Sequence, residues 1–219
     1  MRNLKIILQV LLVLMSMIMV MSAFIWMRCS IEGRRVTADN MAPTLNTNDK
    51  VLFDMTPYRS GHPFVRGQII LFFPPYTKIR PKDISREPML LLDKAFAPPS
   101  LHNPESSIKR VIGLPGDKIE ITNGGVFVND LKVSEPYVKE PARYELHKLK
   151  DIGGELLSGG AIYPYPAQEE PIVVPPGQLF VLGDNRNNSQ DSHLWGFLDA
   201  ERVLGKAILV FYPRLQIIH

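Results

Sequence analysis

The sequence lacks the features on which several large classes of protein depend. It contains one cysteine, Cys29, so no disulfide can form within the chain and no cysteine-based zinc spacing exists. Its five histidines show no HxxxH spacing, and we therefore expect neither a structural metal nor a metal cofactor. The 25 lysines and arginines are nearly balanced by 22 aspartates and glutamates, without a basic block interleaved with aromatics. Nucleic acid is therefore not an expected partner.

The sequence also contains only one long hydrophobic run. Residues Ile6 to Met27 carry no charge and, at about 1.5 Å per residue, form a helix of roughly 33 Å, which is long enough to cross a membrane. A cleaved signal peptide is the alternative, but the run exceeds the usual apolar length of about 7 to 15 residues and no A-x-A site follows it. We expect residues 1–28 to be a single-pass membrane anchor.

The remaining residues, 29–219, have the pattern of one mainly β domain. Asn123-Gly124-Gly125 and Asn129-Asp130 indicate hairpin turns, and no long helical periodicity is present. Two stretches rich in proline and glycine, residues 74–107 and 143–170, are predicted to be long surface excursions; binding of a partner by these stretches is an alternative. Short runs of β-branched and aromatic residues predict strands at 51–53, 68–73, 109–112, 118–121, 126–128, 172–174, 179–182 and 203–212.

Three stretches combine residue types that carry chemistry. The first, Val36 to Leu45, is predicted to run extended and to turn at Pro43, which would hold the side chain of position 40 close to the bilayer surface. The second surrounds Lys109, which has apolar neighbours in a predicted strand that ends at a Pro-Gly turn. If this lysine points inward, desolvation lowers its pKa and makes it a general base; a solvent-facing lysine is the alternative.

The third stretch, Gly183 to Gly196, is dense in Asp, Asn and Ser, whose side chains bond nearby backbone groups and hold irregular loops. Its role could be structural alone. Asp191 and Ser192, close to the bulky Trp195, are also suited to orient a polar neighbour and to shield it from water. His193 suggests a catalytic triad, but no compelling Asp-His-Ser order accompanies it.

Taken together, the three stretches resemble the boxes of the type I signal peptidases, membrane-anchored endopeptidases that remove signal peptides from exported proteins. The family pattern Ser-Met-x-Pro-Thr-Leu is matched from Asn40 to Leu45, and Lys-Arg-x-x-Gly-Leu-Pro-Gly-Asp from Lys109 to Asp117. The loop Gly183 to Gly196 matches the third box, and its sequence is similar to that of cyanobacterial and thylakoid members. The resemblance implies a curled antiparallel β domain that binds signal peptides without a cofactor, on the periplasmic or lumenal side of a plasma or thylakoid membrane.

The resemblance also implies a role for each matched position. Lys109 corresponds to the general base, Ser192 to the serine that positions this lysine, and Asp191 to the acid that steadies the loop. Met41 and Pro43 correspond to residues that shape the substrate cleft, which would hold an extended peptide along a strand from Val36 to Met41. The departures are His193 in place of arginine, Gln68 in place of an acid, and Ala38 where some members have an oxyanion-hole serine.

The largest departure is Asn40, which occupies the position of the nucleophilic serine. A carboxamide has no hydroxyl that a lysine could deprotonate, so we expect weak or no cleavage from the chain as written. Thr37, Thr44 and Ser192 are poorly placed substitutes, and attack by Asn40 on its own peptide bond would release the domain only once. The alternatives are a working peptidase in which Asn40 is compensated, engineered or a sequence error, and a pseudo-peptidase that binds exported segments without cutting them.

Overall fold

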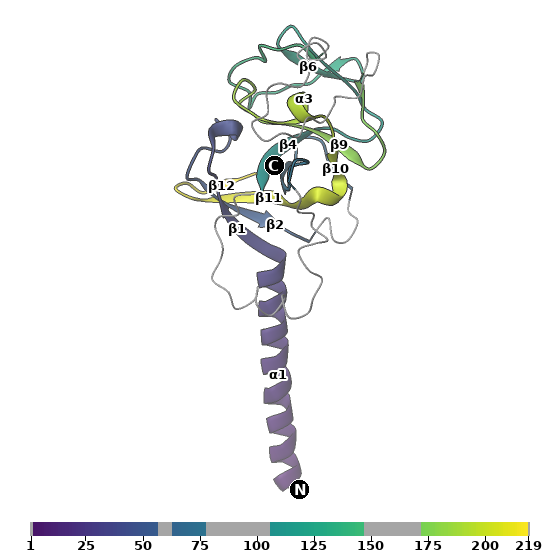
Figure 1. Ribbon diagram of the computed structural model, residues 1–219. Helices are drawn as coiled ribbons and strands as arrows, with labels where there is room; N and C mark the ends of the chain where they lie inside the picture. Colours follow the sequence, from purple (N-terminus) through teal and green to yellow (C-terminus); the bar gives the residue numbers. More distant parts are fainter. Residues whose placement is uncertain (1, 57–62, 78–105, 147–171, 219) are drawn as a thin grey trace.

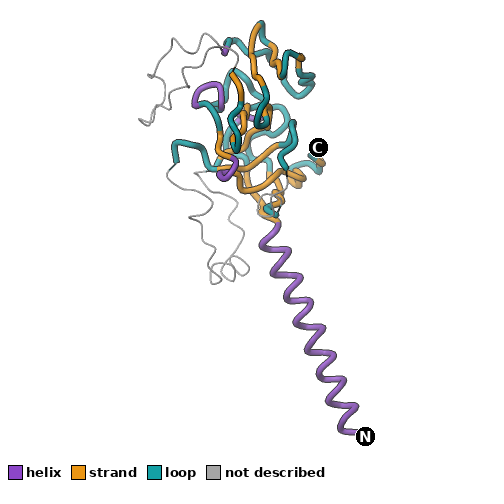
Figure 2. Tube along the Cα trace, turned by 90° about the vertical axis from the view of Figure 1, so that its right-hand side faces the viewer, coloured by secondary structure: helices purple, strands orange, loops and turns teal. Residues whose placement is uncertain are grey.

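The structure is a computed structural model, and it describes residues 2–56, 63–77, 106–146 and 172–218. It begins with one long helix, α1 (Arg2–Ser30), whose segment Leu4–Phe24 has a mean hydropathy of 2.5 and is apolar and long enough to cross a membrane. The described side chains of this segment are exposed, because the helix projects away from the rest of the chain (Figures 1 and 2). The predicted apolar helix is confirmed, and it passes into the first strand with no intervening linker.

An antiparallel sheet of eight strands follows the helix, in the order β1-β2-β11-β3-β4-β9-β10, with β12 also paired to β11. Register shifts interrupt the ladders of β11 with β2 and with β3, and such irregularities bend and twist a sheet. The strands are β1 (Ile31–Arg35), β2 (Lys50–Asp54), β3 (Ile69–Phe72), β4 (Ser107–Gly113), β9 (Gln178–Leu182), β10 (Leu198–Asp199), β11 (Val203–Tyr212) and β12 (Gln216–Ile217).

A second antiparallel sheet of four strands lies at the end of the domain away from the helix (Figure 1). Its order is β7-β6-β5-β8. Asn123 and Asn129 adopt positive φ values of 48° and 52°, as the tight turns predicted at these positions require. Its strands are β5 (Lys118–Thr122), β6 (Gly125–Val128), β7 (Leu131–Lys132) and β8 (Ile172–Val173).

Three apolar clusters fill the interior. The first packs the small sheet against the ends of β4 and β9, through Ile119, Ile112 and Phe180 among others. The second contains Met41 and Leu45 and lies among β2, β3 and β11. The third surrounds Trp195, which is 3% exposed and belongs to the short helix α3 (Ser192–Trp195). The predicted mainly β fold with an N-terminal helix is therefore confirmed.

The predicted strand from Val36 to Met41 is wrong. The strand β1 ends at Arg35, and a 3-10 turn, η1 (Asp39–Met41), occupies the second half of the stretch. Asp39 causes this turn, since its backbone oxygen accepts the Ala42 N–H at 3.1 Å and its carboxylate accepts the Thr47 hydroxyl at 2.6 Å. Most of the two predicted excursions, residues 74–107 and 143–170, lies outside the described residues.

Candidate active site

Position 40 lies on the η1 turn, which is held mainly by its backbone. The backbone oxygen of Asn40 accepts the Asn185 N–H at 3.1 Å, and the Asn185 side-chain amide donates to the backbone oxygen of Asp39, also at 3.1 Å. Hydrogen bonds from Thr47 hold the pKa of Asp39 below its ordinary value. Asn40 itself is half-buried. The turn is therefore held by bonds to its backbone oxygens and to the Asp39 carboxylate.

Lys109 lies on β4, in the middle of the large sheet, and its side chain points into the protein. It is 1% exposed, which excludes the solvent-facing alternative. Burial lowers the pKa of Lys109 to about 8, although the carboxylates of Asp191 and Asp184 act in the opposite direction. The η1 turn lies against β4. A lysine with this pKa is partly neutral at pH 7 to 8, as a general base requires.

Asp191 is completely buried and organises the loop beside the site. Its carboxylate accepts the backbone N–H of Gly183 at 2.8 Å and lies 2.6 Å from Nδ1 of His193. Burial opposes ionisation, but these hydrogen bonds and the charge of Lys109 hold the pKa of Asp191 below its ordinary value. The His193 ring also stacks on Tyr144, with ring centroids 4.0 Å apart. His193 thus supports Asp191.

The two serines of the loop differ in their contacts. Ser192 Oγ accepts the Val181 N–H at 2.9 Å, which ties the loop to β9; its predicted contact with Lys109 stays a prediction. Ser189, which the sequence reasoning did not single out, has a buried hydroxyl with no hydrogen-bond partner among the described residues. A Cβ added to Gly183 would lie 2.2 Å from Ser189 Oγ and 2.4 Å from the backbone oxygen of Asn40. This free hydroxyl therefore lies close to position 40.

The predicted cleft residues occupy different environments. Met41 is fully buried in the second apolar cluster, whereas Ala38 and Pro43 are exposed on either side of η1. Ala38 is extended, with φ −143° and ψ 156°, and the Ala42-Pro43 peptide bond is cis. An extended, exposed residue next to the turn can pair with another extended chain. The role of all three in substrate binding stays a prediction.

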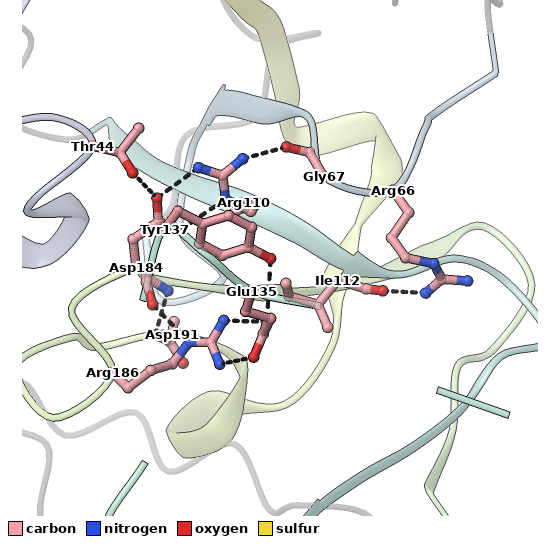
Figure 3. A network of polar contacts seen from close by, with 11 residues as sticks. Thr44, Arg66, Gly67, Arg110, Ile112, Glu135, Tyr137, Asp184, Arg186 and Asp191 are labelled. Atoms are coloured by element: carbon pink, nitrogen blue, oxygen red, sulfur yellow. Dashed lines mark hydrogen bonds and ion pairs between the residues drawn. The ribbon is translucent and has the colours of Figure 1, made fainter. Parts of the chain in front are cut away.

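A network of buried charges surrounds the site (Figure 3). Arg110, the neighbour of Lys109, donates two hydrogen bonds to Asp184, at 2.8 and 2.6 Å, and Thr44 Oγ1 donates to the same carboxylate at 2.5 Å. These bonds join the three stretches that the sequence singles out. The network extends to Arg186, Glu135 and Tyr137, of which the last two lie outside the three stretches. Among the described residues, no three His, Cys, Asp or Glu side chains are grouped to hold a metal ion.

The fold is a mainly β domain that follows a helix long and apolar enough to cross a membrane. The candidate site places a buried lysine beside a turn that an Asp- and Asn-rich loop holds. Residues 7–212 match the family described as signal peptidase, peptidase S26. The chain belongs to this family.

Three sequence relatives agree with the family match. The chain is 34% identical to "Probable signal peptidase I-2" of Synechocystis over 83% of its own length and 63% of the relative's. It is 36% identical to "Probable signal peptidase I-1" of Synechocystis, over 83% and 71%. Thylakoidal processing peptidase 1 of Arabidopsis thaliana is 30% identical, over 83% and 42%. Among solved structures, a comparison found the crystal structure of a signal peptidase I from Enterococcus faecalis. Its sequence is 26% identical, its TM-score is 0.36, and the match covers 66% of this chain and 96% of that one.

Proposed function

We propose that this protein binds the signal peptides of exported precursors in a Ser/Lys peptidase site that is complete except for the hydroxyl at position 40. The observation that carries the proposal is Lys109, a fully buried lysine with a pKa of about 8, on the strand against which the turn of position 40 lies. Burying an amine costs free energy, so the presence of this lysine in the family's position supports a role in the chemistry.

Asn40 determines how much of this chemistry remains. In Ser/Lys hydrolysis the serine oxygen attacks the scissile carbonyl carbon while its proton passes to the neutral lysine amine. The leaving amine takes that proton, and water then hydrolyses the ester. A carboxamide at position 40 cannot perform the first step, and loss of a serine nucleophile costs roughly a million-fold in turnover in a well-studied protease. The chain as written is weakly active or inactive.

The family and the helix support a proposal for the substrate and the location. An exported precursor would lie extended beside Ala38, with small residues next to the scissile bond. The helix α1 would anchor the protein in a plasma or thylakoid membrane by a single pass, with residues 29–219 on the periplasmic or lumenal side. No metal or organic cofactor is required by this mechanism. The alternative is a pseudo-peptidase that retains the cleft in order to bind exported segments without cutting them.

The decisive experiment restores the hydroxyl. A labelled precursor is incubated in detergent with the purified full chain, with Asn40→Ser, and with Asn40→Ser combined with Lys109→Ala. We expect cleavage from Asn40→Ser alone, because the turn and the base are already in place. Mass spectrometry locates the cleaved bond, which distinguishes signal-peptide removal from cleavage between Asn40 and Met41.

The other outcomes overturn defined parts of the proposal. Cleavage of the precursor by the unmodified chain would show that a hydroxyl other than position 40 acts as nucleophile. No cleavage by Asn40→Ser, with precursor still bound, would favour the pseudo-peptidase. Neither cleavage nor binding by Asn40→Ser would contradict the proposed function.

A further inference from the structure

Residues 135–137 connect the small sheet to the site. They follow β7 and reach two arginines of the site (Figure 3). Glu135 accepts two hydrogen bonds from Arg186, at 2.8 and 2.5 Å. The ring of Tyr137 lies 3.8 Å from Cζ of Arg110, and its hydroxyl donates to Glu135 at 3.2 Å. One short segment thus contacts both guanidinium groups.

Each of these arginines also bonds a residue that shapes the site. Arg110 grips the carboxylate of Asp184 and donates to the backbone oxygen of Gly67 at 2.7 Å. Arg186 Nε donates to the backbone oxygen of Gly183 at 3.1 Å. Since Asp184 follows Gly183, the two arginines hold adjacent residues of the same loop. A displacement of residues 135–137 would therefore reach Gly183, against which the backbone of Asn40 lies.

The charges in this network are too deeply buried to tolerate the loss of a partner. Arg186 is 2% exposed and Asp184 is 1% exposed. Burial disfavours the charged guanidinium of Arg186, but its bonds to Glu135 raise its pKa and keep it charged. Burial and the nearby Glu135 raise the pKa of Tyr137, so its hydroxyl stays protonated and remains a donor. Removing one partner from such a set leaves a buried charge without compensation.

We propose that Glu135 and Tyr137 are positioning residues for the reaction: by holding Arg110 and Arg186, they fix the strand that presents Lys109 and the loop that supports position 40. Neither residue need touch the substrate. The inference deepens the proposed function, on which its activity measurement rests. A second measurement, on Lys109 itself, does not depend on activity.

The second measurement uses the environment of Lys109. Arg110 is its chain neighbour, and Asp184, which Arg110 holds, is one of two carboxylates that attract the Lys109 ammonium. If the Tyr137 ring is removed, Arg110 loses a packing surface and water gains access to the network. Hydration favours the charged form of a buried amine, so the titration midpoint of Lys109 should rise towards the value of a free lysine.

The experiment is an NMR titration of the full chain in detergent, with ¹³C at the lysine ε-carbons and Lys109→Arg to identify the signal. We expect Tyr137→Leu to raise the Lys109 midpoint by about 0.5 to 1 unit. Tyr137→Phe, which keeps the ring over Arg110, should leave it nearly unchanged. In the Asn40→Ser background, Tyr137→Leu should lower kcat by about tenfold with little change in KM.

Tyr212→Leu is the matched control, because the Tyr212 ring also lies under a cation, 4.7 Å from Lys50 Nζ, but outside this network. An unchanged Lys109 midpoint in Tyr137→Leu, with a fall in Tm like that of the control, would show a structural role only and overturn the inference. If Tyr137→Leu does not fold, Tyr137→Met, whose flexible side chain refills more of the space, decides in its place. If Asn40→Ser is inactive, the proposed function fails while the titration still decides this inference.

Discussion

The two sides of the site are built in different ways. Lys109 belongs to the middle of an eight-stranded sheet, where the hydrophobic core and buried carboxylates fix its surroundings. Position 40 belongs to a three-residue turn whose backbone oxygens accept hydrogen bonds from the backbone N–H and the side-chain amide of Asn185, so the fold places few demands on the side chain at position 40. We therefore expect a substitution at position 40 to change the stability of the fold little, whereas a substitution of the buried Lys109 should change it strongly and in a way that depends on pH.

Gly183 joins the two sides, and we expect Gly183→Ala to cause the largest loss of stability. The added Cβ would lie 2.4 Å from the backbone oxygen of Asn40 and 2.2 Å from Ser189 Oγ, so the turn has to move. Activity of the Asn40→Ser variant should fall to background, and the free energy of unfolding should fall by about 1 to 3 kcal/mol.

Gly125→Ala serves as the control for this substitution, because there the new Cβ meets the flexible end of Lys132, at 3.1 Å, and a ring atom of Phe127 at the ordinary contact distance of 3.4 Å. Cleavage of the precursor and thermal unfolding measure the two effects. Full activity in the Gly183→Ala background would show that the contact between the loop and the turn is not needed for catalysis.

At Lys109, we expect a substitution to raise the stability of the fold and to lower activity. Because burial lowers the pKa of Lys109 from 10.5 to about 8, the unfolded chain binds the proton more tightly than the folded chain. Lys109→Met should therefore stabilise the fold by about 3 kcal/mol below pH 8. The advantage should shrink as pH rises from 8 towards 10.5 and vanish above it, while Lys109→Met in the Asn40→Ser background should lose activity at every pH.

Thermal or denaturant unfolding of both chains at pH 7 and pH 10 measures this difference. A stabilisation that is equal at the two pH values would indicate that Lys109 does not titrate in that window. The contrast between the two sides would then lose its electrostatic basis.

On the side of the site that contains position 40, we expect a substitution of Asn185 to have a smaller effect on stability and activity. Asn185→Ala removes the bond from the side-chain amide to the backbone oxygen of Asp39 but leaves the bond to Asn40. Stability should fall by about 1 kcal/mol, and activity in the Asn40→Ser background by roughly tenfold, because the turn loosens. Asn187→Ala, which loses the bond to the backbone oxygen of Pro141 and the bond that Asn187 accepts from the Arg143 N–H, should lower stability alone. Equal activity in the two variants would show that the turn needs no clamp.

Local pattern was sufficient to predict most of the fold. The hairpin of β5 and β6 follows from alternating apolar residues on either side of Asn123-Gly124, and burial alternates along β5 as expected. The stretch from Val36 to Met41 was predicted wrongly because its conformation depends on Thr47 and on Asn185, which lies 146 positions from Asp39. No local propensity contains that information.

The same limit applies to the site. The residues near Lys109 in the sequence allowed either an inward or an outward side chain, and only the packing of β4 between β3 and β9 determines the choice. Ser189 lies within the third stretch, but the prediction for this stretch names Ser192 and not Ser189. Glu135 and Tyr137 belong to no sequence motif. Arg186, the partner of Glu135, lies 51 positions away, and Arg110, the partner of Tyr137, lies on β4. Long-range pairing is what sequence reasoning missed.

The uninterrupted passage from α1 into β1 has a consequence for how the protein would meet its substrates. If α1 crosses a membrane as proposed, it continues for about six residues, or roughly 9 Å, beyond the apolar span before the first strand begins, and it would be a rigid support for the domain. This support would set the height of the site above the lipid and restrict its rotation. Under the proposed function, a membrane-bound precursor would then search for the site in two dimensions, at a raised effective concentration. Only segments that emerge at the matching height would be presented to the turn.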